Sequence, residues 1–264
     1  MCLALLAVDV HPRYRLIVGA NRDEFHDRPT APAGPWPDAP GVLAGRDLQA
    51  RGTWLGITAA GRVALVTNYR EGRRPPPGAP SRGRLVADFL TGDETPPAYV
   101  ARIAADDARY PGYNLIVGDA EALLYRSNRG GATRGLGAGV YGLSNHLLDT
   151  PWPKVERSKA GLFQLLTRDG EALADGLFEL LSDHSRPDDH ELPDTGIGLE
   201  WERLLAAAFI ASESYGTRSS TVVLAERGGS ITLIEQSFGP GGVPLGRVRH
   251  VLAGGPEAAR RTAG

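Results

Sequence analysis

The alternation of apolar and polar segments predicts pairs of short strands near the start of the chain. Residues 3–8 and 14–20 are apolar runs separated by a short polar turn, which is the pattern of an antiparallel hairpin. Residues 52–58 and 62–69 form a second pair of the same kind. Between the two pairs, the proline-rich segment 28–40 is expected to be a loop.

Helical periodicity then alternates with further strands. Apolar residues recur at helical spacing in residues 83–90, 98–108, 154–181 and 199–210. Short apolar runs typical of strands occur at residues 113–117, 122–125, 139–144, 219–225 and 230–237. Tight turns join adjacent strands, and regular strand–helix–strand alternation is missing. The pattern therefore favours antiparallel sheets covered by helices over a doubly wound parallel sheet.

The same pattern gives an expectation for domain organisation. No internal repeat and no linker interrupt the chain, so a single domain is expected over residues 1–252. Residues 253–264 are rich in Gly, Ala and Arg and are expected to form a disordered tail.

Composition excludes several classes of function. The chain has 264 residues, of which 42% are hydrophobic and 23% charged, as in ordinary globular proteins. With 29 Lys and Arg against 31 Asp and Glu, no basic excess favours nucleic acid, and no apolar run has the length of a membrane span. A single cysteine excludes an intrachain disulfide and a multi-cysteine zinc site, so no metal site is expected. The first segment lacks the basic region of a secretory signal, which favours a cytoplasmic location, and no feature specifies an oligomeric state.

The position of that single cysteine carries chemical information. Cys2 directly follows Met1, so removal of Met1 gives one residue with both a thiol and a free α-amine. An α-amine with an ordinary pKa of about 7.7–8 is partly neutral near pH 7, and it can accept the thiol proton to form the attacking thiolate. The alternative interpretation is a small, inert, buried cysteine.

Asn-Arg-Asp-Glu at residues 21–24 follows the second strand. If residues 3–8 and 14–20 pair as a hairpin, this polar stretch lies beside Cys2. Arg22 would then favour the thiolate, and Asp23 would hold the α-amine through a charge-assisted hydrogen bond. The alternative interpretation of four consecutive polar residues is a solvated turn.

Three further polar residues stand at strand ends. Asn68 and Asn145 each end an expected strand, and Arg218 opens a later one. An asparagine amide can stabilise a developing oxyanion. The alternatives are two turn asparagines and a surface arginine.

Eight motifs together are typical of one known family. They are Cys2, Asn-Arg-Asp-Glu at 21–24, Gly-Thr-Trp-Leu-Gly-Ile at 52–57, Thr-Asn-Tyr at 67–69, Asn-Arg-Gly at 128–130, Tyr-Gly-Leu-Ser-Asn at 141–145, Thr-Pro-Trp-Pro-Lys at 150–154 and Tyr-Gly-Thr-Arg at 215–218. On these motifs the chain resembles the NRDE family, the family of transport and Golgi organisation protein 2. The family is similar to N-terminal nucleophile hydrolases, which implies an α+β fold: a four-layer αββα sandwich of two antiparallel sheets.

The resemblance also implies a candidate activity. By similarity to the cysteine amidases of that superfamily, Cys2 would be the nucleophile and its α-amine the base in hydrolysis of a linear amide or acyl bond. No cofactor would be required. The accompanying catalytic set would be Arg22, Asp23, Asn68, Asn145 and Arg218. The amidases space their arginine and aspartate differently from the motif at 21–24.

The family has also been tied to haem trafficking and to lipid or acyl-CoA homeostasis. This implies an alternative, a non-catalytic protein that binds haem or an acyl lipid in the same cleft. Under either function the expected partner is a small molecule, an acyl or amide ligand or haem. Ligand contacts are expected from Asn21, Tyr69, Arg73, Arg74 and His146.

An arginine-rich loop follows Asn68 closely. Its arginines flank three consecutive prolines, and they are Arg70, Arg73, Arg74, Arg82 and Arg84. The loop is either an exposed basic segment or a lid that attracts an anionic ligand to the site.

Overall fold

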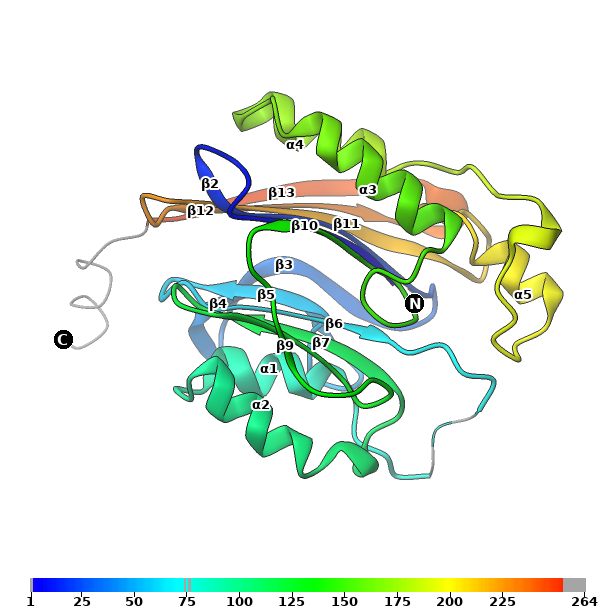
Figure 1. Cartoon of the computed structure of the whole chain (residues 1–264), viewed down its shortest axis with the longest axis horizontal. Coiled ribbons are helices and arrows are strands. Elements are labelled where there is room, and N and C mark those ends of the chain that lie inside the picture. Colours follow the sequence, from blue (N-terminus) through cyan, green and yellow to red (C-terminus); the bar gives the residue numbers. More distant parts are fainter. Residues whose placement is uncertain (1, 74, 76, 254–264) are drawn as a thin grey trace.

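Two antiparallel sheets stack face to face at the centre of the molecule (Figure 1). The computed structural model describes residues 2–73, 75 and 77–253. One sheet contains, in spatial order, β10 (Gly139–Leu143), β1 (Cys2–Val8), β2 (Tyr14–Phe25), β11 (Tyr215–Glu226), β12 (Ile231–Phe238) and β13 (Pro244–Leu252). The other contains β3 (Thr30–Trp36), β4 (Ala39–Asp47), β5 (Leu55–Thr58), β6 (Val63–Asn68), β7 (Tyr113–Gly118), β8 (Leu123–Ser127) and β9 (Arg134–Gly135).

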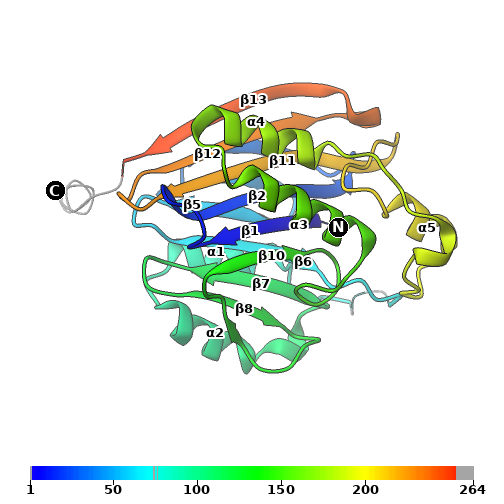
Figure 2. The same cartoon turned by 45° about the horizontal axis from the view of Figure 1, so that its top comes forward.

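Helices cover the outer faces of both sheets. α1 (Gly83–Thr91) and α2 (Pro96–Ala104) lie on the seven-stranded sheet, and α3 (Pro153–Leu165) and α4 (Gly170–Leu181) lie on the six-stranded sheet (Figures 1 and 2). The short α5 (Leu199–Leu204) lies at one end of the sandwich. Single 3₁₀ turns occur at Asp107–Arg109, Asp189–Glu191 and Pro240–Gly242. The expected four-layer α+β arrangement of two antiparallel sheets is confirmed.

Burial on both faces explains the continuous apolar runs of the central strands. Successive side chains of a strand point to opposite faces. In β1, Ala4 and Leu6 pack into the core between the sheets, whereas Leu3 and Leu5 pack against α3 and α4. Because both faces are covered, the strand has no polar positions in residues 3–8.

Several boundaries differ from the sequence-based expectations. The expectation of a loop at residues 28–40 is wrong, because β3 occupies Thr30–Trp36. Its prolines are tolerated since β3 is an edge strand, where a missing N–H removes no ladder hydrogen bond. The expected helix at 199–210 ends at Leu204, and the helical stretch at 154–181 is split into α3 and α4.

Other differences concern the strands themselves. β4 and β13 were not expected from the sequence. Residues 21–24 lie within β2 and not in a turn after it, because β11 continues to pair with this stretch as far as Phe25. Of the expected tail at 253–264, residues 254–264 lie outside the described residues. Within the described ranges, no helix has the length and apolar character needed to cross a membrane.

A glycine in β4 makes room for an aromatic side chain between the sheets. A Cβ atom added at Gly45 would lie 2.2 and 2.3 Å from two ring carbons of Trp54. Trp54 packs against the core between the sheets, and the Arg22 guanidinium lies 4.2 Å from its ring centroid. Because position 45 has no side chain, the Trp54 ring fits against β4 and can stack on Arg22 of the other sheet.

We expect Gly45→Ala to lower the free energy of unfolding by about 1–3 kcal/mol, because the added methyl group overlaps the Trp54 ring. Urea denaturation followed by tryptophan fluorescence measures this change. Gly34→Ala in the neighbouring strand is the matched control, since no atom lies within 4 Å of a Cβ at that position. Equal stability of the two variants would contradict the packing argument.

Candidate active site

Cys2 lies at the start of a central strand, between two strands that both carry candidate site residues. It is half-buried, and its Cα pairs with that of Arg22 in β2. On the other side, β10 pairs Leu143 with Ala4, so the same register brings Asn145 level with Cys2. The Ser144 hydroxyl donates to the Cys2 carbonyl at 3.1 Å, which ties the two segments together.

Arg22 lies on the face of β2 that looks into the space between the sheets. Its guanidinium stacks on Trp54, and Nη1 donates to the Thr30 hydroxyl at 3.2 Å. Burial lowers the pKa of Arg22, while the neighbouring Glu24 and Cys2 act in the opposite direction. An arginine remains cationic at neutral pH despite such a shift. The fold thus holds a buried cation next to the Cys2 thiol.

Asp23, the next residue, points to the opposite face of the sheet, toward the helices. Its side chain is 1% exposed, and Oδ1 accepts a hydrogen bond from the Thr217 hydroxyl at 2.8 Å. The Tyr215 hydroxyl donates to the Asp23 carbonyl at 3.2 Å. Burial raises the pKa of Asp23, and the nearby Lys154 ammonium opposes that increase.

Lys154 is a buried cation that no local sequence pattern predicts. It is 2% exposed, and Nζ donates to the carbonyls of Leu205 and Ala207 at 2.8 and 3.4 Å. Burial lowers the pKa of Lys154 to about 8, and the Arg70 charge adds to this, while Asp23 and Cys2 oppose it. Lys154 belongs to the Thr-Pro-Trp-Pro-Lys motif, but helical spacing alone gave no reason to bury it.

A buried ion pair lies next to this lysine. Arg70 Nη1 and Glu202 Oε2 are 2.5 Å apart, and their side chains are 2% and 4% exposed. The Arg70 guanidinium also lies over the Trp152 ring, 4.7 Å from its centroid. Arg70 is therefore not part of an exposed basic loop, and Glu202 lies in a helical segment whose sequence gave no signal. Buried charges are costly unless compensated, and clusters of them are typical of functional sites.

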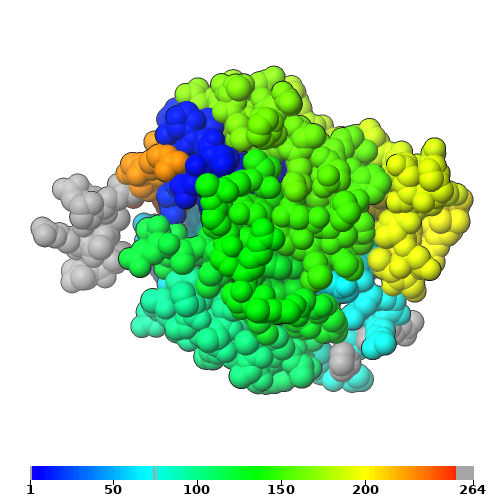
Figure 3. All heavy atoms as spheres, in the orientation of Figure 1, coloured from blue at the N-terminus to red at the C-terminus, as the bar shows by residue number. Residues whose placement is uncertain are grey.

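The segment that carries α5 is anchored by the same glutamate. Glu202 Oε1 accepts hydrogen bonds from the main-chain N–H and the hydroxyl of Thr195, at 2.9 and 2.5 Å. The Gly72 N–H donates to the Thr195 carbonyl at 3.0 Å. Accordingly, the α5 segment and the loop after β6 lie next to each other at one end of the molecule (Figure 3).

The two candidate asparagines are in direct contact. Asn145 is fully buried, and its Nδ2 donates to the Asn68 carbonyl at 3.0 Å. Its Oδ1 accepts a hydrogen bond from the Ser144 hydroxyl at 3.3 Å. Within the described part of the chain, the second hydrogen of Nδ2 has no recorded acceptor. Asn145, which is level with Cys2 in the sheet, therefore has one N–H without a protein acceptor among the described residues. Asn68 is half-buried at the end of β6.

Arg218 lies further from Cys2 along the sheet, at a bulge where β11 pairs with β2. Its Nη1 donates to the carbonyls of Phe25 and Arg28, at 2.7 and 3.1 Å. Burial lowers the pKa of Arg218. The structure thus uses this guanidinium to hold the turn between β2 and β3, on the far side of Arg22 from Cys2.

Asn21 lies on the helix-facing side of β2. Its Nδ2 donates to the carbonyls of Leu181 and Ala208, both at 2.8 Å, and its Oδ1 accepts from the Ser220 hydroxyl at 2.6 Å. All these contacts join β2 to its neighbouring elements. The amide group of Asn21 is thus engaged by protein atoms.

Tyr69 and His146 stack beside the asparagines, with ring centroids 4.9 Å apart. His146 Nδ1 and the Thr150 hydroxyl are 2.8 Å apart, which leaves Nε2 as the nitrogen that a haem iron would take under the alternative function. Burial lowers the pKa of His146. Arg73 is exposed in the loop after β6, and Arg74 lies outside the described residues. Among those described, no group of three or more His, Cys, Asp or Glu could hold a metal ion.

Two helix-covered antiparallel sheets thus carry a cysteine at the start of a central strand. The family model for Transport and Golgi organisation 2 matches residues 1–240, and the chain belongs to this family. The resemblance inferred from the eight motifs is confirmed.

Two sequence relatives support the family assignment. The chain is 38% identical to the Transport and Golgi organization protein 2 homolog of Bos taurus over 258 residues, covering 90% of this chain and 93% of the relative. It is 36% identical to the Mus musculus homolog over 259 residues, with the same coverage. A solved structure of the Caenorhabditis elegans N-acylethanolamine-hydrolyzing acid amidase ortholog overlaps with a TM-score of 0.48 at 13% identity, covering 84% of this chain and 92% of that one.

We expect the stability contribution of Lys154 to depend on pH. The folded lysine releases its proton at about pH 8, whereas the ordinary value is 10.5. Between these values the unfolded chain binds more protons, so stability rises with pH through this window. Relative to Lys154→Met, the native protein should gain on the order of 3 kcal/mol from pH 8 to pH 10.5.

Chemical denaturation at a series of pH values measures this difference, and subtraction of the variant removes the contribution of other titrating groups. Lys159→Met controls for the loss of one ammonium group, since Lys159 lies on the same helix at a partly exposed ion pair with Asp149. A constant difference between the native protein and Lys154→Met across the window would refute the assignment.

Proposed function

We propose that this protein is a cysteine amidase that acts on a linear amide or related acyl bond, with Cys2 as nucleophile once the residue before it is removed. The observation that carries the proposal is the register of the first hairpin, which pairs Cys2 with Arg22. Asp23 follows on the same strand and points to the opposite face. Arg22 therefore supplies a cation beside the thiol, and Asp23 supplies a buried carboxylate on the side of the helices.

The α-amine of Cys2 accepts the thiol proton, and the thiolate attacks the carbonyl carbon of the substrate. The positive charge of Arg22 favours the thiolate over the thiol. Asp23 lies beside the start of β1 on the helix-facing side, where a carboxylate orients a protonated amine. The amine gains positive charge as the thiol proton moves to it, so Asp23 stabilises that stage.

The tetrahedral intermediate carries its negative charge on the former carbonyl oxygen. The uncommitted N–H of Asn145 is the donor next to Cys2, and Asn68, at the adjacent strand end, contributes to the same environment. Collapse of the intermediate breaks the C–N bond, and the leaving amine takes the proton from the Cys2 ammonium. The α-amine of Cys2, now neutral, deprotonates a water molecule, which attacks the thioester. The acid is released, and the Cys2 thiolate recovers the proton from its ammonium group.

A second candidate function is non-catalytic binding of haem or an acyl lipid near the same residues. The observation that favours it is an aromatic surface beside the charged cluster. Phe25 and Trp201 are 45% and 40% exposed, and both rings pack on Tyr215, with centroids 5.0 and 5.6 Å apart. Exposed aromatic groups of this kind suit an apolar ligand.

We expect acylation of Cys2 when the mature protein is incubated with activated acyl donors such as p-nitrophenyl esters of different chain lengths. Intact-mass measurement, followed by peptide mapping, should locate the acyl group on the N-terminal peptide. Cys2→Ala should abolish the adduct, and Asn145→Ala should slow acylation by about 10²–10³-fold, the usual loss for an oxyanion donor.

Asn68→Ala serves as a second test in case Asn145→Ala does not fold, and thermal denaturation checks the folding of each variant. A protein whose N-terminus is shown by mass to be Cys2, yet which forms no adduct and turns over no donor, is not an amidase of this kind.

The two candidate functions differ in their need for a free amine. We expect a protein with extra residues before Cys2 to lose acylation, because the amine is then an amide and cannot accept a proton. Binding of haem or of an acyl lipid, followed by absorbance or calorimetry, should be unchanged in the same protein if the second function applies. Loss of both properties would point to a general disturbance of the site.

A further inference from the structure

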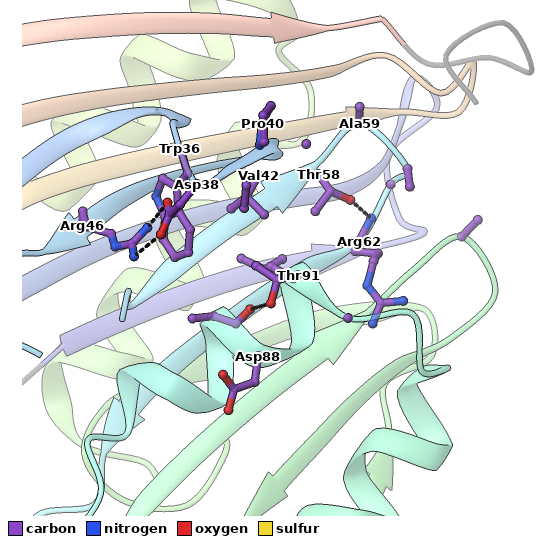
Figure 4. Close-up of a pocket in the computed structure, with 18 of the residues that line it drawn as sticks. Trp36, Asp38, Pro40, Val42, Arg46, Thr58, Ala59, Arg62, Asp88 and Thr91 are labelled. Atoms are coloured by element: carbon purple, nitrogen blue, oxygen red, sulfur yellow. Dashed lines mark hydrogen bonds and ion pairs between the residues drawn. The ribbon is translucent and has the colours of Figure 1, made fainter. Parts of the chain in front are cut away.

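A large cavity lies on the outer side of the seven-stranded sheet, and none of the candidate site residues lines it. Its volume is about 1380 Å³. One wall is α1, and another is formed by the end of β3 and the start of β4, with Trp36 and Val42 (Figure 4). The hairpin at 58–62 and, from the other sheet, Arg15, Glu226 and Arg227 also line it. A ligand cavity of this size accommodates an organic molecule with an extended body.

The middle of this cavity is apolar. Trp36 and Val42 lie on the side of the strands, and Ala87 and Leu90 lie on the side of α1. Because α1 is nine residues long, its groove-facing side extends over roughly 13 Å. The groove therefore offers an apolar path along the helix, with Thr91 near its far end (Figure 4).

Most arginines that line the cavity are already engaged. Arg46 forms a two-bond pair with Asp38 at 2.9 Å and stacks on Trp36. Arg62, at the other end, donates three hydrogen bonds to main-chain carbonyls around the end of α1. By contrast, Arg51 and Arg84 are exposed, and within the described chain neither side chain forms a recorded ion pair or hydrogen bond.

The two uncommitted arginines extend from segments that touch. A Cβ atom at Gly52 would lie 2.5 Å from the Gly83 carbonyl carbon and 2.9 Å from the Arg84 nitrogen, so the chain next to Arg51 packs on the first turn of α1. That turn contains no acidic residue. A cation at a helix N-terminus is unfavourable against the helix dipole unless an anion compensates it. Among the described residues, the lining of the groove contains six arginines against three acidic residues, Asp38, Asp88 and Glu226, so positive charge is in excess.

We propose that the groove binds an amphipathic organic anion, with its carboxylate or phosphate head between Arg51 and Arg84 and its apolar body along α1 toward Thr91. The head group is expected at this end and not at the C-terminal end of α1, because the Arg62 guanidinium there is held by main-chain carbonyls. The site is separate from Cys2, and it does not depend on the proposed amidase activity.

Asp88 provides a test of the charge argument. It lies one helical turn after Arg84, lines the groove and is exposed. Its carboxylate repels an anionic head and attracts a cationic one. Neutralising Asp88 and neutralising Arg84 should therefore change the affinity for an anion in opposite directions.

Isothermal titration calorimetry of the full chain in a Cys2→Ala background tests the proposal without acyl chemistry at Cys2. The probe is dodecanoate below its micellar concentration, compared with dodecanol, butyrate and dodecyl phosphate. Dodecanoate should bind, and dodecanol and butyrate should each bind at least about tenfold more weakly, because one lacks the charge and the other the apolar body. Tighter binding of dodecyl phosphate would support the site with phosphate as the head group.

Substitutions locate the binding in the groove. Arg51→Gln and Arg84→Gln should each weaken dodecanoate binding about tenfold, Asp88→Asn should tighten it, and Thr91→Trp should obstruct it. Arg186→Gln, at an exposed arginine away from the groove, removes the same charge and should have no effect. Absence of dodecanoate binding, equal binding of dodecanol, or equal affinity of the Arg84→Gln and Arg186→Gln proteins would overturn the proposal.

Discussion

The main-chain pairing of β1 with β2 is the constraint on which the candidate site depends. Side chains alternate across a sheet, so a shift of the register by one residue would exchange the faces of every side chain involved. In the observed register, Arg22 stands next to Cys2 in the space between the sheets, and Asp23 faces the helices. The apolar residues of β1, buried on both faces, make such a shift costly. The core thus determines the relative positions of the charged groups.

The charges around Cys2 are stabilised collectively. Asp23, Arg70, Lys154 and Glu202 are each at most 4% exposed, and any one of them alone would cost several kcal/mol to bury. The ion pair between Arg70 and Glu202, together with main-chain carbonyls around Lys154, offsets much of that cost. Folds retain such groups where chemistry or specificity requires them, and here they gather at the head of one strand.

The helix-covered antiparallel sheets followed from apolar spacing, because burial on one or both faces leaves a clear period in the sequence, whereas the four-layer arrangement was implied by the family resemblance. The polar cluster was only partly predictable. The nearness of Cys2 and Arg22 followed from a hairpin between neighbouring segments, whereas the contact of Arg70 with Glu202 joins positions 132 residues apart. No local pattern specifies such a contact. Prolines were also misleading, since β3 tolerates them only through its place at a sheet edge, which depends on the whole topology.

The docking of the α5 segment has an energetic consequence for access to the charged cluster. Glu202 binds both Arg70 and Thr195, so one carboxylate joins the α5 segment to the loop after β6. Detachment of the α5 segment would expose the Arg70 guanidinium and the Glu202 carboxylate to water. Hydration of the two charges would then recover part of the energy of the broken ion pair. Heating makes the hydration of separated charges less favourable, so the cost of detaching this segment through its ion pair rises with temperature.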